Sequence, residues 1–151
     1  VKDNYKFSIG NFYFGTDGNK YNKLLYRNNL SNSSKNTNHY LQMDGPSILE
    51  FTLKIIPQAI NKYLENNSSS LDNYEYIIFH QANKFILDKL YKKIGIKEKG
   101  LIEIINCGNT TSSSIPITLE KLLKKNGYKK SNILLVGFGS GLSWGVTSII
   151  I

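Results

Sequence analysis

Short apolar runs alternate with segments of helical periodicity over most of this chain, and that alternation limits the folds open to it. The run at 132–138, NILLVGF, is continuously apolar, which is typical of a strand buried on both faces. Between such runs, apolar residues recur every three or four positions, the period of a helix. The pattern predicts the order β-α-β-α-β-α-β-β, an α/β domain in which helices cover a mixed sheet.

The expected elements occupy most of residues 1–151, which we interpret as a single domain. Strands are expected at 5–14, 75–79, 101–106, 132–138 and 142–151, and helices at 45–66, 83–94 and 113–126. Gly95 and Gly127 follow two of the helices, as C-terminal caps do. Pro57 is expected to bend the first helix or to start a new turn. A polar, low-complexity stretch at 28–38 is expected to be a mobile loop.

Composition excludes some classes of protein. The net charge is +8, but the lysines are scattered over helix-like stretches, and no arginine–aromatic stripe indicates a nucleic-acid platform. No apolar run approaches the ~18 residues of a membrane span.

Cys107 is the single cysteine, so an intrachain disulfide is excluded and a reducing, cytoplasmic compartment is expected. The chain starts with Val1, and we expect it to be a fragment of a longer protein.

His80 is the first candidate for chemistry. It ends the apolar strand YIIF and precedes a helix, and in layered α/β folds ligands gather at the carboxyl ends of strands. The positive end of the helix dipole favours a neutral imidazole, which can donate a hydrogen bond to an oxygen that gains negative charge. The alternative, a capping or core histidine, is equally compatible with this position. His39, in the polar stretch, is expected to be a solvated surface group.

Two further polar or glycine-rich turns follow expected strands, and the one at 106–116 has the same strand-turn-helix layout as the His80 turn. Asn109 follows the second of these strands in a Gly-Asn-Thr turn and could donate from its amide, although turn chemistry alone also explains it. The turn GFGSG at 137–141 fits neither the nucleophile elbow nor the dinucleotide fingerprint, and a tight hairpin also accounts for its glycines. The two histidines and the cysteine have no metal-ligand spacing, so no metal is expected.

Five stretches, in order, resemble β-ketoacyl-acyl-carrier-protein synthase III, a family of the thiolase superfamily. They are FGTDGN, MDGPSILEF, FHQANKFILDKLYKKIGI, NCGNTTSSSIPITLEKLL and ILLVGFGSGLSWGVTSIII. Together they run from about Gly10 to the C-terminus. The resemblance implies the C-terminal half of a thiolase-like fold and an enzyme that condenses acyl-coenzyme A with malonyl-acyl-carrier protein to start fatty-acid synthesis. It implies no cofactor beyond these thioester substrates, and a homodimer for the full-length enzyme.

The resemblance also implies roles for individual residues. His80 and Asn109 would stabilise the enolate of the malonyl thioester, and the backbone N–H of Ser140 would serve an oxyanion hole. The pantetheine arm would be bound by Asn83, Gly45 and Met43. Carrier-protein docking would use the segment after the histidine, namely Gln81, Ala82, Lys84 and Phe85.

The chain departs from the family pattern at several positions. The acyl-accepting cysteine lies in a segment that this chain does not contain, and Cys107 is interpreted instead as a small buried residue. Phe85 stands where the family has an arginine, and Leu49 stands where an aromatic often lines the arm tunnel. Two alternatives therefore remain: a related thiolase-fold acyltransferase that primes another pathway, and a non-catalytic carrier-binding half-domain.

Overall fold

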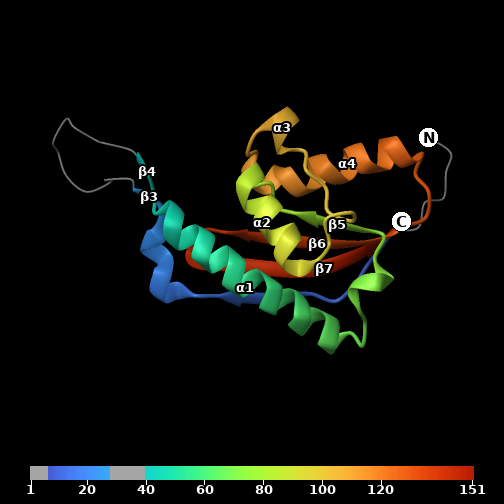
Figure 1. Cartoon of the computed structure of the whole chain (residues 1–151), viewed down its shortest axis with the longest axis horizontal. Helices are drawn as coiled ribbons and strands as arrows, with labels where there is room; N and C mark the ends of the chain where they lie inside the picture. Colours follow the sequence, from blue (N-terminus) through green and yellow to red (C-terminus); the bar gives the residue numbers. More distant parts are fainter. Residues whose placement is uncertain (1–6, 28–39) are drawn as a thin grey trace.

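The computed structural model describes residues 7–27 and 40–151 (Figure 1). Its strands are β1 Ser8–Ile9, β2 Tyr13–Thr16, β3 Leu24–Arg27, β4 Tyr40–Met43, β5 Tyr76–Phe79, β6 Asn132–Gly139 and β7 Ser143–Ile150. Its α-helices are α1 Gly45–Asn66, α2 Lys84–Ile94, α3 Ile104–Cys107 and α4 Ser114–Asn126. The predicted loop at 28–38 and His39 lie outside the described residues.

The main sheet is mixed, as predicted. Its order is β1-β7-β6-β5, and β2 also pairs with β7. β5 and β6 run parallel, with Phe79 opposite Val136, whereas β6 and β7 form an antiparallel hairpin. The carboxyl ends of β5 and β6 therefore lie at one edge of the sheet, where ligand chemistry gathers in such folds.

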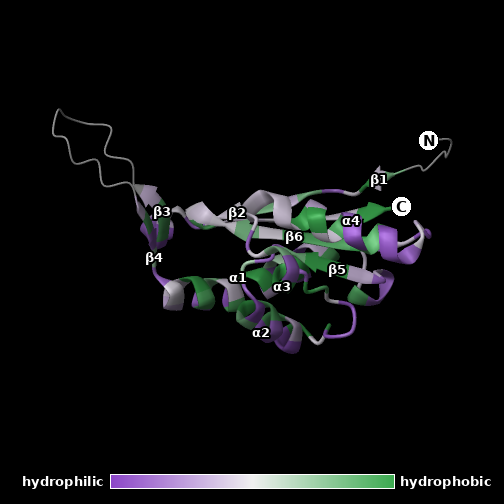
Figure 2. Cartoon of the chain, turned by 90° about the horizontal axis from the view of Figure 1, so that it is seen from above, coloured by the Kyte–Doolittle hydropathy of each residue, from purple (hydrophilic) through white to green (hydrophobic). Residues whose placement is uncertain are grey.

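Helices cover both faces of this sheet, which confirms the predicted α/β class. One buried cluster joins α1 and α2 to the sheet through residues such as Ile60, Leu87 and Val136. A second cluster packs α4 on the opposite face, where Leu122 lies against Ile78 and Ile133. Figure 2 shows the hydrophobic residues concentrated in the central strands and the hydrophilic ones on the outward parts of α2 and α4.

The two C-terminal caps predicted from the sequence are confirmed, and the structure adds an N-terminal cap that was not predicted. Asp44 caps α1, since its carboxylate accepts a hydrogen bond from the Ser47 N–H. Gly95 and Gly127 both adopt the left-handed conformation at the ends of α2 and α4. α1 runs through Pro57 as one continuous helix, so the proline starts no new element.

The strand predicted at 101–106 is wrong. The one bridge to β5 found here is between Ile77 and Gly100, the residue before this segment, and the segment itself turns into the short helix α3. The reason is the Gln81 side chain. Its Oε1 atom accepts hydrogen bonds from the backbone N–H groups of Glu103 and Ile104, so these groups are not available to a strand ladder. The small sheet formed by β3 and β4 was not predicted either.

Candidate active site

His80 lies directly between β5 and α2. Its backbone N–H donates to the Val136 carbonyl at 2.8 Å, which continues the parallel pairing of β5 with β6 by one residue. The imidazole is half-buried and meets the Phe138 ring edge-on, with 5.4 Å between centroids. The strand thus delivers the ring to the edge of the sheet, as the sequence predicted.

Burial favours the neutral form of the His80 imidazole. Burial lowers the pKa of His80 below its ordinary value because the charged ring loses solvation, and an interaction with the Thr111 backbone opposes this in part. The Nδ1 atom lies 2.8 Å from Oγ of Ser114, the first residue of α4. A neutral, anchored ring can donate one hydrogen bond to a substrate.

Asn109 is oriented by two backbone contacts. Its Oδ1 accepts the Thr111 N–H at 2.9 Å, and its Nδ2 donates to the Ala82 carbonyl at 3.2 Å. The Ala82 N–H in turn donates to the His80 carbonyl at 3.0 Å. The two predicted donors therefore lie at the same place in the fold, and the second hydrogen of the Asn109 amide group is free of these contacts.

Ser140 stands at the same edge of the sheet. It follows Gly139, the last residue of β6, and starts a 3-10 turn that leads into β7. Its side chain is exposed. The three turns that the sequence singled out thus converge on the carboxyl ends of β5 and β6. Whether the Ser140 N–H serves an oxyanion hole stays a prediction.

Met43 ends β4, and Gly45 is the first residue of α1. Figure 1 shows this end of α1 and the β3–β4 hairpin at the same end of the sheet as the β6–β7 turn. Lys23 lies 3.0 Å from the Asp44 carboxylate and lowers the pKa of Asp44 to about 2. A Cβ added at Gly45 would meet no atom within 4 Å, so packing of the described chain does not require glycine there.

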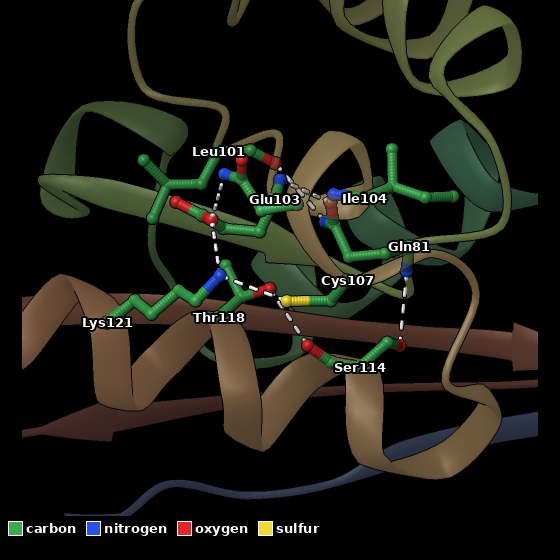
Figure 3. Close-up of polar contacts among 9 residues, drawn as sticks. Gln81, Leu101, Glu103, Ile104, Cys107, Ser114, Thr118 and Lys121 are labelled. Carbon is green, nitrogen blue, oxygen red and sulfur yellow. Dashed lines mark hydrogen bonds and ion pairs between the residues drawn. The ribbon is translucent and has the colours of Figure 1, made fainter.

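Gln81 is not a surface residue, which corrects its predicted docking role. It is 2% exposed, and its side-chain NH₂ donates to the carbonyls of Phe79 and Leu101. Together with the two N–H groups that its oxygen accepts, this amide ties the 101–104 segment to β5 (Figure 3). A side chain with all of its polar groups satisfied inside the protein is not available to a partner.

The remaining predicted binding residues lie around the start of α2. Asn83 caps this helix, since its Oδ1 accepts the Ile86 N–H at 2.8 Å, and its binding of the pantetheine arm stays a prediction. Ala82 is half-buried. Lys84 and Phe85 are exposed on the first turn, so docking through these two side chains stays a prediction.

Cys107 is exposed, so its interpretation as a buried residue is wrong. It ends α3, and its Sγ lies 3.0 Å from Nζ of Lys121, which also pairs with Glu103 at 3.0 Å (Figure 3). The cause is the loss of the expected strand, because α3 turns the segment outward. Ser114 was missed as a site residue, since the run TTSSS shows capping residues but not which of them faces His80.

Neither a cluster of metal-binding side chains nor a membrane-spanning helix is found among residues 7–27 and 40–151. No three His, Cys, Asp or Glu side chains gather there in a way that could hold a metal ion. In the same ranges, none of the helices has the length and apolar character needed to cross a membrane.

The mixed sheet, its helix layers and the His–Asn pair at the strand ends define the C-terminal half of a thiolase-like fold. A family model described as 3-Oxoacyl-[acyl-carrier-protein (ACP)] synthase III C terminal matches residues 64–151. The chain therefore belongs to the 3-oxoacyl-[acyl-carrier-protein] synthase III family and corresponds to its C-terminal part.

Individual relatives agree with this assignment. The beta-ketoacyl-[acyl-carrier-protein] synthase III of Clostridium tetani is 37% identical over 93% of this chain and 47% of its own length. A crystal structure of a 3-oxoacyl-(acyl-carrier-protein) synthase III superposes with a TM-score of 0.82 at 32% identity, over 95% of this chain and 48% of that one. The priming beta-ketosynthase of the R1128 polyketide pathway gives a TM-score of 0.82 at 25% identity, over 95% and 45%. The chain thus spans about half the length of these relatives.

Proposed function

We propose that this chain is the C-terminal half of an enzyme that condenses acyl-coenzyme A with malonyl-acyl-carrier protein and so starts fatty-acid synthesis. The observation that carries the proposal is the position of His80 and Asn109 at one sheet edge. Both are connected to the backbone of Ala82, whose carbonyl accepts from the Asn109 side chain and whose N–H donates to the His80 carbonyl. A binding module has no need of two such donors.

The chemistry that this pair serves is decarboxylation followed by carbon–carbon bond formation. The malonyl thioester loses carbon dioxide, and the electron pair of the broken bond moves onto the thioester oxygen as an enolate. His80 and Asn109 donate hydrogen bonds to that oxygen, and each such donor contributes about 3–4 kcal/mol in comparable sites. The enolate carbon then attacks the acyl-enzyme thioester, and the cysteine leaves as a thiolate. The cysteine is supplied by the N-terminal half.

Other residues bind the substrates in this proposal. The free Nδ2 of Asn83 and the open space beside Gly45 suit an approaching pantetheine arm, which exposed Met43 would also contact. The Ser140 N–H donates to the oxygen of the acyl-enzyme. The carrier protein docks against Lys84 and Phe85, which project from α2. The thioester chemistry itself needs no further cofactor.

We also place the enzyme in the cytoplasm as a homodimer. A single cysteine and no disulfide suit a reducing compartment. Phe12 and Phe14 stack on one another at 5.4 Å and are both exposed, and such an aromatic surface suits cover by another half or subunit.

A second candidate is an enzyme that primes another pathway. The similarity to a priming beta-ketosynthase of polyketide biosynthesis favours it, as do Phe85 and Leu49, which depart from the family pattern. Both candidates use the same decarboxylation, so they differ in the starter acyl group and in the carrier.

The test joins this chain to an N-terminal half that carries the acyl-accepting cysteine. Purified enzyme is given malonyl-carrier protein labelled at the free carboxyl group, and released carbon dioxide is counted, with and without a series of acyl-coenzyme A starters. We expect release and a condensed product with a short acyl starter. A folded enzyme that acylates but releases no carbon dioxide from any malonyl thioester would contradict the proposal.

A further inference from the structure

Ser114 touches the imidazole of His80 and has no part in the function proposed above. It starts α4 and is 2% exposed. Its Oγ lies 2.8 Å from His80 Nδ1 and 3.2 Å from the backbone nitrogen of Gln81. Figure 3 shows Ser114 on α4 directly below Gln81.

The hydrogens of this contact can be counted. The Gln81 N–H can only donate, so the serine oxygen is the acceptor there. The hydroxyl group has one hydrogen to give, and the structure places His80 Nδ1 within its reach. If Nδ1 carried a hydrogen instead, the oxygen would accept twice and the buried hydroxyl hydrogen would have no partner, which is unfavourable. The contacts of Ser114 therefore favour Nδ1 as the acceptor and the ring hydrogen on Nε2. The Thr111 backbone, whose interaction raises the pKa of His80, is a second polar partner of the same ring.

We propose that Ser114 is a positioning residue that holds His80 as the Nε2–H tautomer. The consequence rests on the proposed function: the Nε2 hydrogen is the one that His80 presents to the thioester oxygen. A hydroxyl partner suits this task because, unlike a carboxylate, it does not favour the protonated ring. The Phe138 ring, edge-on to the imidazole, limits its rotation further.

Nitrogen NMR of the imidazole tests the assignment without any substrate. The chain has two histidines, so the His39→Gln variant leaves His80 as the only one. Long-range proton–nitrogen correlation, recorded at about pH 8 where the ring is neutral, distinguishes the two tautomers. We expect the Nε2–H form alone. In Ser114→Ala we expect the other tautomer to become populated, whereas Ser114→Thr, which keeps the hydroxyl, should not change the spectrum.

The matched control is Ser113→Ala, which removes an exposed neighbouring serine that makes no side-chain cap to α4. It should give the unchanged tautomer. An Nδ1–H tautomer of His80 in the chain that keeps Ser114 would overturn the proposal. A folded Ser114→Ala chain with unchanged signals from the His80 ring would also overturn it. If Ser114→Ala does not fold, the His80 tautomer in the chain that keeps Ser114 decides whether the proposal holds.

The rate of decarboxylation is a second measurement, and it should not change if the role of Ser114 is only structural. In the joined enzyme, Ser114→Ala should lower kcat for decarboxylation about tenfold with KM unchanged, less than the loss expected on removing a donor outright. Ser114→Thr should restore it, and an unchanged kcat in Ser114→Ala would overturn the positioning role. Because the tautomer is read without substrate, a failure of the proposed function leaves that result intact.

Discussion

Nδ2 of Asn109 lies 3.2 Å from the carbonyl oxygen of Ala82, a residue 27 positions earlier in the chain. This contact joins the turn after α3 to the turn after β5. It fixes which end of the Asn109 amide faces the site, because Oδ1 is bound to the Thr111 N–H. The two donors are thus part of one hydrogen-bonded unit, and the first prediction depends on that.

Removing the side-chain donor of His80 or of Asn109 should slow decarboxylation of the malonyl thioester but not the earlier acylation of the cysteine. We expect His80→Ala and Asn109→Ala to lower malonyl decarboxylation about 10²–10³-fold in the joined enzyme, with acylation of the cysteine largely unchanged. The double variant should lose far less than the product of the two effects, since both donors act on one oxygen in the proposed mechanism. Separate assays of acyl transfer and of carbon dioxide release measure this.

The controls for that pair are Asn106→Ala, which removes an exposed amide from α3, and Ser140→Gly, which keeps the backbone N–H. Both should retain decarboxylation. If His80→Ala instead abolished acylation while decarboxylation proceeded, His80 would be the base for the thiol and the assigned role would be wrong.

The lowered pKa of His80 predicts a specific dependence of stability on pH. Below about pH 6.5 the unfolded chain binds a proton at this histidine, whereas the folded chain does so only at lower pH. The free energy of unfolding should therefore fall as the pH drops below this value, and His80 should contribute no slope above it. Urea unfolding between about pH 5 and 7.5 should show the slope. His39→Gln should keep it and His80→Gln should reduce it; the same slope in both would refute the prediction.

Cys107 should not become acylated. It is exposed, but it ends α3 next to Lys121 and belongs to the turn that holds Asn109, not to an acyl-accepting site. Incubation of the 151-residue chain with labelled acyl-coenzyme A should leave the protein mass unchanged. A stable adduct mapped to Cys107, absent from Cys107→Ser, would overturn this assignment.

Gly100 should be intolerant of a side chain. A Cβ there would lie 2.7 Å from the ring of buried Tyr91, which in turn donates a hydrogen bond to the Leu101 carbonyl. We expect Gly100→Ala to lower the free energy of unfolding by about 1–3 kcal/mol, as overpacking does. Gly18→Ala is the control, because a Cβ at Gly18 meets nothing within 4 Å. Equal urea midpoints for the two variants would count against this packing.

Loss of the Gln81 side chain should destabilise the chain more than loss of an exposed glutamine. Gln81→Ala leaves the N–H groups of Glu103 and Ile104 without their acceptor, at about 1–3 kcal/mol for each group that stays buried. Gln58→Ala, on the exposed side of α1, should change the free energy of unfolding by less than about 0.5 kcal/mol. Comparable effects from the two substitutions would show that the amide does not organise the 101–104 segment.

The sequence by itself determined the three longer helices α1, α2 and α4, the central strands and the turns where the site lies. The continuously apolar run at 132–138 predicted a central strand, which β6 is, and Gly95 and Gly127 end helices because left-handed backbone favours glycine. His80 and Asn109 could be singled out because each follows the end of an expected element and their motifs resemble one family.

Only the tertiary structure decided what depends on contacts between distant segments. The stretch at 101–106 has the composition of a strand, but the buried amide of Gln81 takes its N–H groups and turns it into α3. Cys107 is exposed and Gln81 is buried, the reverse of both expectations. Ser114 meets His80 across 34 residues, and which serine of TTSSS does so depends on where α4 begins and how it lies against the sheet, which a run of capping residues alone does not show.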